Sequence, residues 1–297
     1  MSRTPSNVRI SIAPSFSLIP TFKMGFSVNR SLSKRSIGVA AGLLAALMTQ
    51  SAAADAPAIA RLQYSANIGA NIIDAVSFAA RRDFVDDDLT GTRLREQIAG
   101  LSDNVVLHDF HIESNSNVLF ALDIGATLGG TYYSPADVIR YSGSFSKEFD
   151  AAAAGVPKEV HCDGVARSGS NGRLLLSFDK TFTVGGVTIR PADVIAYSGG
   201  AFGAKVLDAQ ALGLLANLNV DAIDTFGTTN YLLVSFDTGG TIAGIPFTSA
   251  DVMQLHRNDG SWSKRFTLST FSNRWDTANL DGLAAVNNDT IFQNDFE

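Results

Sequence analysis

The chain of 297 residues contains one cysteine, Cys162, eight prolines and only 18% charged residues. A single cysteine excludes an intramolecular disulfide and any metal site built from several thiolates. Glycine and proline are too few for collagen or a low-complexity polymer, and the hydrophobic fraction of 45% is too high for a disordered chain. These absences leave a globular protein, whose length suits one all-β domain or two ordinary domains.

Acidic residues are absent from positions 1–54, which carry six lysines and arginines. An apolar run from Ile37 to Met48 follows and ends in small residues. A basic segment, a short apolar segment and an Ala-x-Ala-like site before Asp55 predict a secretory signal peptide at 1–54. The alternative is an uncleaved anchor, but twelve helical residues rise only about 18 Å, short of a hydrocarbon core of about 30 Å. Because the basic segment is long, Met24 is an alternative start of translation.

The sequence after position 54 holds 17 basic and 29 acidic side chains, a net charge of −12. A surface of this sign repels nucleic acid and anionic lipid, so we expect no nucleic-acid partner. No later stretch is long and apolar enough to span a membrane. An acidic chain with almost no cysteine predicts an exported bacterial protein of the periplasm, the cell surface or the medium.

The sequence after position 100 repeats itself with a period of 56–60 residues. Each copy has an apolar segment that ends in aspartate. A second aspartate follows fourteen residues later in the sequence Ala-Asp-Val, and a third lies where the next unit begins. In this order the aspartates are Asp123, Asp179 and Asp237; Asp137, Asp193 and Asp251; and Asp163, Asp221 and Asp281.

Each unit predicts four short strands, because β-branched and aromatic residues alternate between Gly, Asn, Asp and Ser boundaries. In the third copy the predicted strands are Val220–Phe226, Tyr231–Phe236, Asp251–His256 and Trp262–Thr267. Four strands per unit match one blade of a β-propeller, in which blades stack around an axis to bury their faces. Three blades are nearly complete, at 105–154, 162–210 and 219–270.

A fourth blade is predicted to be split between the two ends of the chain. Asn71–Asp74 and the segment 84–89, with Asp88 in the place of Asp137, resemble its second and third strands, and Arg93–Ile98 is the candidate outer strand. Its innermost strand would be Leu280–Val286, which closes the ring and removes exposed sheet edges. The sequence therefore predicts an all-β, four-bladed propeller; a linear solenoid and a two-sheet sandwich are the alternatives.

The propeller is expected over 70–287, after a short linker at 55–69 and before a tail at 288–297. Its Ser-Phe-Asp, Gly-Gly and Ala-Asp-Val steps resemble propeller-like repeats of uncharacterised exported bacterial proteins. The residues 291–297 are similar to acidic-aromatic C-terminal tails of exported Gram-negative proteins, with Asp295 where those tails have glycine. The resemblance implies an exported propeller and supplies no catalytic residues.

The first two sets of aspartates recur in every copy, which favours a structural role over one active site. Aspartate at the end of a strand accepts hydrogen bonds from backbone N–H groups of the following turn. Asp163, Asp221 and Asp281 begin the predicted innermost strands and would line the central channel. Three carboxylates around one axis could hold Ca²⁺. Leu107 occupies the aligned position of the remaining blade, so we expect no cofactor and keep Ca²⁺ as the alternative.

Other chemical candidates are weak. His108 and His111 lie three residues apart on a predicted strand, so they point to opposite faces and cannot chelate one metal. His161 and Cys162 are adjacent and also point apart, which predicts a core cysteine rather than a nucleophile. Nucleophile-elbow, phosphate-loop and EF-hand patterns are absent from the sequence.

These observations predict an exported, non-enzymatic propeller that acts as a binding or structural module for an unknown protein or polysaccharide. The alternative is a carbohydrate-active enzyme, either a glycoside hydrolase or a polysaccharide lyase. Such an enzyme would use two carboxylates on a propeller face, with Asp163, Asp221 and Glu159 available.

Overall fold

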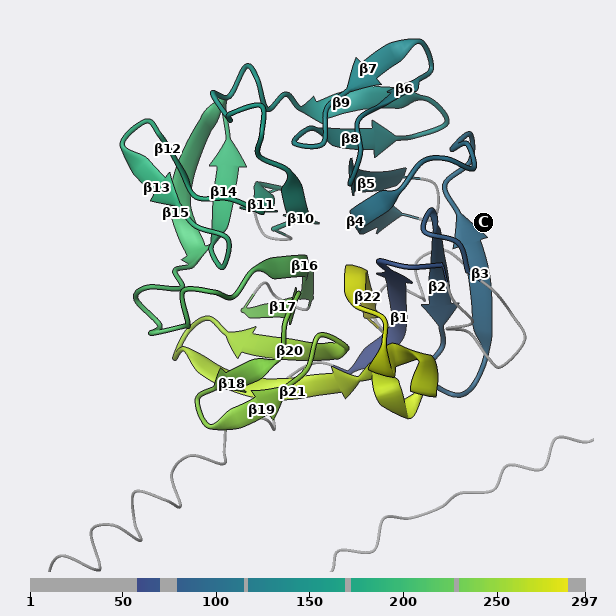
Figure 1. The fold of residues 1–297 in the computed structure, drawn as a ribbon, viewed down its shortest axis with the longest axis vertical. Coiled ribbons are helices and arrows are strands. Elements are labelled where there is room, and N and C mark those ends of the chain that lie inside the picture. The colour runs from purple at the N-terminus through teal and green to yellow at the C-terminus, as the bar shows by residue number, and fades with distance from the viewer. Residues whose placement is uncertain (1–57, 70–78, 115–116, 169–171, 227–229, 288–297) are drawn as a thin grey trace, which may run out of the picture. The chain divides into compact units, whose positions relative to one another are not determined.

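The computed structural model of the protein describes residues 58–69, 79–114, 117–168, 172–226 and 230–287. These residues form four antiparallel sheets of four strands each, which surround a common axis as the blades of a propeller (Figure 1). The predicted all-β, four-bladed fold is therefore confirmed. The predicted signal peptide, the segment Asn71–Asp74 and the C-terminal tail lie outside the described residues.

Three blades follow the sequence repeat, and each runs in order from the axis outward. The first repeat blade contains β4 (Leu107–Ser114), β5 (Asn117–Leu122), β8 (Val138–Tyr141) and β9 (Phe145–Phe149). The second contains β10 (Cys162–Arg167), β11 (Leu174–Phe178), β14 (Val194–Ser198) and β15 (Ala201–Leu207). The third contains β16 (Val220–Phe226), β17 (Tyr231–Phe236), β20 (Asp251–His256) and β21 (Ser261–Thr267), which confirms the four strands predicted for this copy.

A small hairpin connects the second and third strands of every repeat blade. The hairpins are β6 (Ala126–Leu128) with β7 (Thr131–Tyr133), β12 (Phe182–Val184) with β13 (Val187–Ile189), and β18 (Gly240–Ile242) with β19 (Ile245–Phe247). Their two-residue turns need positive φ at both positions, which explains the Gly-Gly repeat. Gly129 and Gly130 have φ of 56° and 85°, whereas the third copy places Ala243 at φ 50°.

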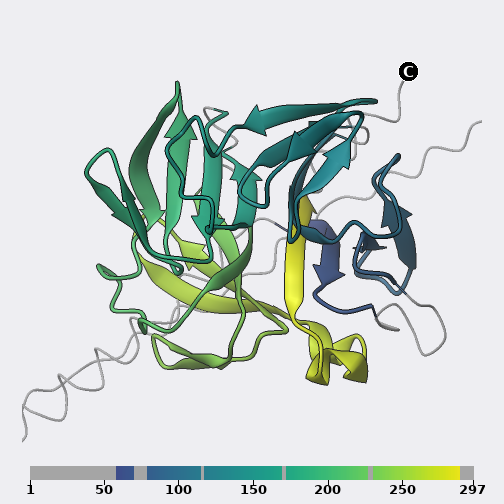
Figure 2. The same cartoon turned by 45° about the horizontal axis from the view of Figure 1, so that its top comes forward.

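The N-terminal blade joins the two ends of the described chain. It contains β22 (Leu280–Asn287) next to the axis, then β1 (Ile59–Ala66), β2 (Asp83–Asp87) and β3 (Arg93–Gln97). β22 runs antiparallel to β1, with Leu62 opposite Ala285 and Tyr64 opposite Leu283 (Figure 2). The last strand thus closes the ring as predicted, and two short 3₁₀ helices, η1 (Leu268–Thr270) and η2 (Asn273–Asp276), lead into it.

The partner of the closing strand differs from the prediction. β1 lies inside the segment 55–69 that the sequence predicts as a linker, so Leu280–Val286 pairs with Ile59–Ala66 and not with the neighbourhood of Asn71. β1 escapes the repeat pattern because it ends in Ala66 and Asn67, where the other second strands end in aspartate. The predicted outer strand is confirmed as β3.

The Ala-Asp-Val aspartates tie the outer strands of each blade together. Asp137 accepts hydrogen bonds from the N–H groups of Ser134 (2.8 Å) and Ala151 (2.9 Å), and Lys147 Nζ lies 3.0 Å from it. Asp193 repeats this arrangement with the N–H groups of Arg190 and Ala209 and with Lys205. Asp251 accepts the N–H of Thr248 and pairs with Lys264, while its Oδ1 has no partner among the described residues. In each repeat blade one carboxylate therefore binds a backbone donor and an ammonium group of neighbouring segments.

The N-terminal blade contains an equivalent aspartate, but at an earlier position in the sequence than predicted. Asp83, not Asp88, is the equivalent of Asp137, because Asp83 accepts the N–H of Ala80 at 2.8 Å and the side-chain amide of Gln97 at 2.7 Å. Asp88 instead accepts N–H groups of the following turn, from Thr90 at 2.9 Å and Thr92 at 2.9 Å. The interval of fourteen residues between Asp74 and Asp88, which matches the other copies, favours Asp88 in the sequence.

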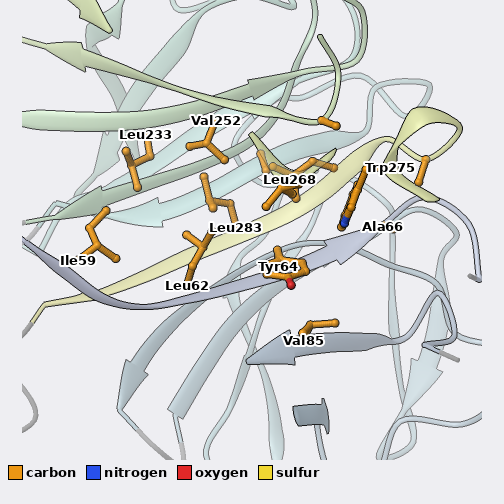
Figure 3. Close-up of a cluster of buried hydrophobic side chains, with 14 of the residues drawn as sticks. Ile59, Leu62, Tyr64, Ala66, Val85, Leu233, Val252, Leu268, Trp275 and Leu283 are labelled. Carbon is orange, nitrogen blue, oxygen red and sulfur yellow. The ribbon is translucent and has the colours of Figure 1, made fainter. Parts of the chain in front are cut away.

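The hydrophobic core consists of four layers, one between each pair of neighbouring blades. The layer at the closure joins Leu62, Tyr64 and Leu283 of the N-terminal blade to Leu233 and Val252 of the third repeat blade (Figure 3). A single blade cannot bury both of its faces, so each layer depends on the ring being closed.

Closure is expected to dominate stability. Leu283 is completely buried in the closing strand, so Leu283→Ala should lower the free energy of unfolding by about 2–5 kcal/mol. Leu94→Ala provides the control, because Leu94 is 50% exposed on the outer strand β3 and should change stability by less than about 0.5 kcal/mol. Urea unfolding measures both values; equal effects of the two variants would contradict this role of closure.

Candidate functional site

Each innermost strand carries one extra residue near its start, relative to the strand it pairs with. The irregularities lie between Leu107 and Phe110, Cys162 and Gly164, and Val220 and Ala222, and β22 has the same one opposite Ser65 and Ala66. Such bulges redirect side chains and are common beside functional sites. Here they place one polar residue of every blade at one end of the axis: His108, Asp163, Asp221 and Asp281.

This register corrects the sequence alignment by one residue. Leu107 is equivalent to Cys162, Val220 and Leu280, all of which are buried, so the first repeat blade contributes His108 and not Leu107 to the ring. The predicted gap among the three aspartates is thus filled by an imidazole. We call these four residues the axial ring.

The side chains of the axial ring lie close to one another. His108 Nε2 is 3.6 Å from Asp163 Oδ1 and 3.8 Å from Asp221 Oδ1. One ligand atom each of His108, Asp221 and Asp281 lie within 4.8 Å of one another. The three aspartates are buried, with only 1–5% of their surface exposed. The ring therefore concentrates carboxylates where little solvent separates them.

A cavity of about 310 Å³, which we call the channel mouth, opens above the axial ring. Apart from Arg81, which lies just before β2, the residues that surround the ring come from the ends of second strands and from positions just before innermost strands. They are Asn67, Arg81, Asp123, His161, Asp179, Asn219, Asp237 and Asn279. Asp123, Asp179 and Asp237, which the sequence predicts as structural turn residues, thus line the same cavity as the predicted channel aspartates.

The surrounding residues hold part of the ring in place. Asn219 Nδ2 donates to Asp163 Oδ2 at 2.7 Å, and Asn279 Nδ2 donates to Asp221. Asp179 accepts the N–H of His161 at 2.7 Å, and Arg81 donates to Asp123 at 2.9 Å. These contacts hold one oxygen atom of each of these carboxylates.

Several buried acceptors of the channel mouth have no hydrogen-bond partner among the described residues. They are Asp163 Oδ1, Asn219 Oδ1 and Asn279 Oδ1. Buried polar atoms normally find a partner, so a cluster of open acceptors in one cavity indicates that something else satisfies them.

The ring perturbs its own protonation. Burial opposes the charge of His108, but Asp221, Asp163 and Asp281 outweigh it and raise its pKa to about 10. Burial raises the pKa of Asp163 to about 7, against the opposing effects of His108 and Asn219. Burial and the neighbouring charge of Asp221 raise the pKa of Asp281 to about 8. At neutral pH His108 is therefore an imidazolium, while Asp163 and Asp281 still hold part of their protons.

Below the ring, the side chain of Asp109 fills the axis itself. Its carboxylate accepts the N–H groups of Val165 (2.7 Å), Ile223 (3.2 Å) and Leu283 (3.1 Å), one from each of the other three blades. The other blades have Gly164, Ala222 and Gly282 at the position of Asp109, which leaves room for one carboxyl group. Burial raises the pKa of Asp109 well above its ordinary value, while these N–H groups and that of Phe110 act in the opposite direction.

Other residues that the sequence singled out lie away from the channel mouth. His111 Nδ1 contacts Asp224 Oδ1 at 2.8 Å further along the axis. Cys162 is buried and burial raises the pKa of its thiol, so it lacks the thiolate that a nucleophile needs. Glu159 is exposed and does not line the cavity, so it cannot act with Asp163 there. Asp137, Asp193 and Asp251 form the ties between outer strands described above.

Several residues of the site were not predicted, among them His108 as a ring member, Asp109 on the axis, and Asn219 and Asn279 beside the ring. His108 and Asp109 interrupt the Asp-small pair that begins the other innermost strands, and this exception was the available signal. Asn219 and Asn279 precede Asp221 and Asp281 by two positions, and the repeat alignment contains this spacing. The spacing alone does not reveal the bulge that brings these asparagines beside the ring.

Comparisons with known proteins identify no family. No protein-family model matches the sequence, and no curated protein matches it. Among solved structures, the chain is similar to one in the crystal structure of a nidogen/laminin complex (8% identity, 70% of this chain, 62% of that chain, TM-score 0.33). It is also similar to a protein of unknown function from Bacteroides caccae (9%, 69% and 57%, TM-score 0.27). A third is the extracellular domain of a putative one-component system from B. thetaiotaomicron (11%, 68% and 28%, TM-score 0.32). The chain spans less than two thirds of the length of each of these structures.

Asp109 is expected to be the least replaceable polar residue. Asp109→Ala leaves buried N–H groups of several blades without an acceptor, at about 1–3 kcal/mol for each group, and should severely reduce or abolish folding. Asp109→Asn keeps one acceptor oxygen and resembles the neutral acid, so it should retain more stability at pH 7. Circular dichroism and urea unfolding distinguish the two. Asp103→Ala, at a side chain that is 92% exposed, is the control; an Asp109→Ala protein as stable as this control would refute the role of Asp109.

Stability is expected to fall as the pH rises from 5 to 8. Asp163 and Asp281 ionise near pH 7 and 8 when folded but near pH 4 when unfolded, so over this range the folded chain binds more protons. His108 acts in the same direction between about 6.5 and 10, because deprotonation removes its attraction to the carboxylates. Urea unfolding in chelator at pH 5, 6.5 and 8 measures this slope. Asp281→Asn should flatten it, and a wild-type stability that rises with pH would contradict the assignment.

Proposed function

We propose that this chain is an exported, non-enzymatic binding module whose channel mouth holds a divalent cation. The observation that carries the proposal is a set of buried acceptors without a partner among the described residues, Asp163 Oδ1, Asn219 Oδ1 and Asn279 Oδ1, in a cavity that the buried Asp221 and Asp281 also line. Buried carboxylates are costly unless they are paired or coordinate a metal. Six aspartates line the cavity, whereas its positive charges are Arg81 and the imidazolium of His108. The partner that the module binds remains a protein or a polysaccharide.

The donor atoms favour a metal that accepts both nitrogen and oxygen. His108 Nε2 with one oxygen each of Asp221 and Asp281 supplies three ligands within reach of a single ion. Imidazole with carboxylates suits Zn²⁺ or Mn²⁺, whereas Ca²⁺ takes oxygen ligands only. Ca²⁺ would instead use the aspartates together with the side-chain carbonyls of Asn219 and Asn279. We therefore expect Zn²⁺ or Mn²⁺ to bind more tightly than Ca²⁺.

The carbohydrate-active alternative has one supporting observation. Asp163 and Asp281 have pKa values raised to about 7 and 8, and a carboxyl group that keeps its proton near neutral pH is what a general acid requires. Their burial argues against this use, because a cavity of about 310 Å³ above nearly inaccessible carboxylates does not admit a polymer chain. Binding is therefore favoured over catalysis.

Export is proposed from the basic and apolar segments of positions 1–54, whose interpretation as a signal peptide stays a prediction. None of the described helices is long and apolar enough to cross a membrane. The acidic charge after position 54 is consistent with the periplasm, the cell surface or the extracellular space as the site of action.

Divalent cations are expected to stabilise the chelator-treated chain. At a free concentration 100 times the dissociation constant, an ion should add about 2.7 kcal/mol to the free energy of unfolding. The gain should be larger at pH 8 than at pH 6, because His108 and the carboxyl groups must lose protons to become ligands. Thermal unfolding and titration calorimetry with Zn²⁺, Mn²⁺ and Ca²⁺ measure these effects.

Variants of the axial ring separate the possible ions. His108→Gln replaces the imidazole by an amide oxygen, so it should weaken Zn²⁺ and Mn²⁺ binding and preserve any Ca²⁺ binding, whereas Asp281→Asn should weaken all three. Asp276→Asn, at an exposed position of η2, is the matched control and should change nothing. If no cation shifts the unfolding temperature, or if the control variant abolishes the shift, the cation site does not exist.

A further inference from the structure

A second cavity, of about 510 Å³, lies between the N-terminal blade and the first repeat blade, which are neighbours in the ring of blades (Figure 1). We call it the side pocket. Ile112 lines it near the end of β4, whereas His108 of the axial ring lies near the start of that strand, so the side pocket is at the other end of the blades from the channel mouth. The two cavities share no lining residue, and a ligand of the side pocket does not require a cation at the mouth.

The wall that the first repeat blade provides is apolar. It consists of Ile112, Val118 and Tyr141, which form one row because Ile112 pairs with Val118 and Val118 pairs with Tyr141 across neighbouring strands. Phe84 and Ile98 of the N-terminal blade are buried in the same layer and extend this surface. The side pocket therefore offers a continuous apolar surface that includes an aromatic ring.

The wall that the N-terminal blade provides carries hydrogen-bonding groups. Arg61 donates to Asp86 through Nε, at 3.0 Å, and through Nη2, so the two side chains form a bidentate pair. Gln63 lies directly opposite Asp86 on the neighbouring strand, and its Oε1 is buried without a hydrogen-bond partner among the described residues. Glu96 of β3 lines the side pocket at an exposed position. A guanidinium has five N–H donors and a carboxylate about four acceptor sites, so the Arg61–Asp86 pair retains both kinds of group for a ligand.

The side pocket has little net charge. Arg61 and Asp86 neutralise each other, and Glu96 is the remaining charged side chain of its lining. Burial raises the pKa of Asp86, while the charge of Arg61 and hydrogen bonds from Arg61 and Gln63 act in the opposite direction. Donors and acceptors that lie together without a strong excess of one charge suit hydroxyl groups, because a hydroxyl group both donates and accepts.

The corresponding contact between the first and second repeat blades is built differently. Arg140 occupies the position of Asp86 in the first repeat blade. It pairs with Glu113 and Glu148, and Arg167 of the second repeat blade pairs with the same two carboxylates. Four paired charges thus join those two blades, whereas Asp86 pairs within its own blade and lines a cavity. The side pocket is therefore a property of this blade pair and not of the repeat.

We propose that the side pocket binds one pyranose ring of a neutral sugar. A pyranose has an apolar C–H face, which packs against the row that contains Tyr141, and hydroxyl groups at its edge, which the Arg61–Asp86 pair, Gln63 and Glu96 bind. The volume of the side pocket lies within the range of about 300–1,000 Å³ that is usual for small-molecule sites. The partner of the proposed binding module is then a polysaccharide, whether or not the channel mouth holds a cation.

The test titrates the full chain with glucose, galactose, mannose and N-acetylglucosamine, and with sorbitol as an acyclic polyol. Calorimetry should show saturable binding of at least one pyranose and none of sorbitol. Glu96→Ala removes a charged acceptor and should weaken that binding at least about 10-fold, whereas Glu96→Gln keeps an acceptor oxygen and should retain most of it. Tyr141→Leu keeps an apolar side chain without the ring and should weaken binding by about 2- to 10-fold.

Glu159→Ala and Tyr132→Leu are the matched controls, because both residues are exposed and neither lines the side pocket. They should leave sugar binding unchanged, and circular dichroism checks the fold of every variant. Should Tyr141→Leu fail to fold, Glu96→Ala at its exposed position still decides. The proposal is overturned if no pyranose binds saturably, if sorbitol binds as well as the sugars, or if the controls weaken binding as much as the variants of the side pocket.

A cationic ligand is the competing outcome, since Glu96 and Tyr141 could also attract an ammonium group. Choline that binds saturably where no sugar does, with an affinity that falls with added salt and is lost in Glu96→Gln, would replace the sugar by a cation and refute the proposal. Asp281→Asn should not affect sugar binding, so a failure at the side pocket leaves the cation site of the channel mouth standing.

Discussion

The four innermost strands approach one another so closely that their backbone N–H groups need an acceptor on the axis, and Asp109 is that acceptor. Its carboxyl group receives hydrogen bonds from Val165, Ile223 and Leu283, which come from three different blades. One side chain of β4 is therefore hydrogen-bonded to the innermost strands of the other three blades. The small residues that replace it in the other blades are a consequence, because the axis has space for one carboxyl group only.

The axial ring follows from the same geometry. A bulge in each innermost strand places His108, Asp163, Asp221 and Asp281 immediately next to Asp109, so charged groups gather where four backbones meet. Structural repetition explains three identical aspartates, and the first repeat blade departs from the repetition at two positions, His108 and Asp109. The polar groups on the axis therefore include two residues that depart from the repeat, His108 and Asp109, beside the three repeated aspartates.

Most of the fold could be predicted because it depends on local patterns that recur. Alternating apolar residues and Gly-Gly turns defined three blades, and a spare C-terminal strand indicated closure. The partner β1 could not be found in this way, because Ala66 and Asn67 lack the aspartate that marks the other second strands. Asp88 was preferred to Asp83 because it lies fourteen residues after Asp74, the interval found in the other copies, whereas hydrogen bonding to Ala80 and Gln97 identifies Asp83.

The candidate site was predictable only in part. Three channel aspartates followed from the repeat, but a one-residue bulge is invisible in the sequence and exchanged Leu107 for His108.

The position of β22 also governs the order in which the molecule can be completed. A chain that is synthesised or translocated from its N-terminus delivers this strand last. Until β22 is added, β1 has no inner neighbour and Asp109 lacks the N–H of Leu283. The apolar layer that contains Tyr64 also lacks Leu283. The ring of blades therefore closes only after the chain has emerged as far as β22.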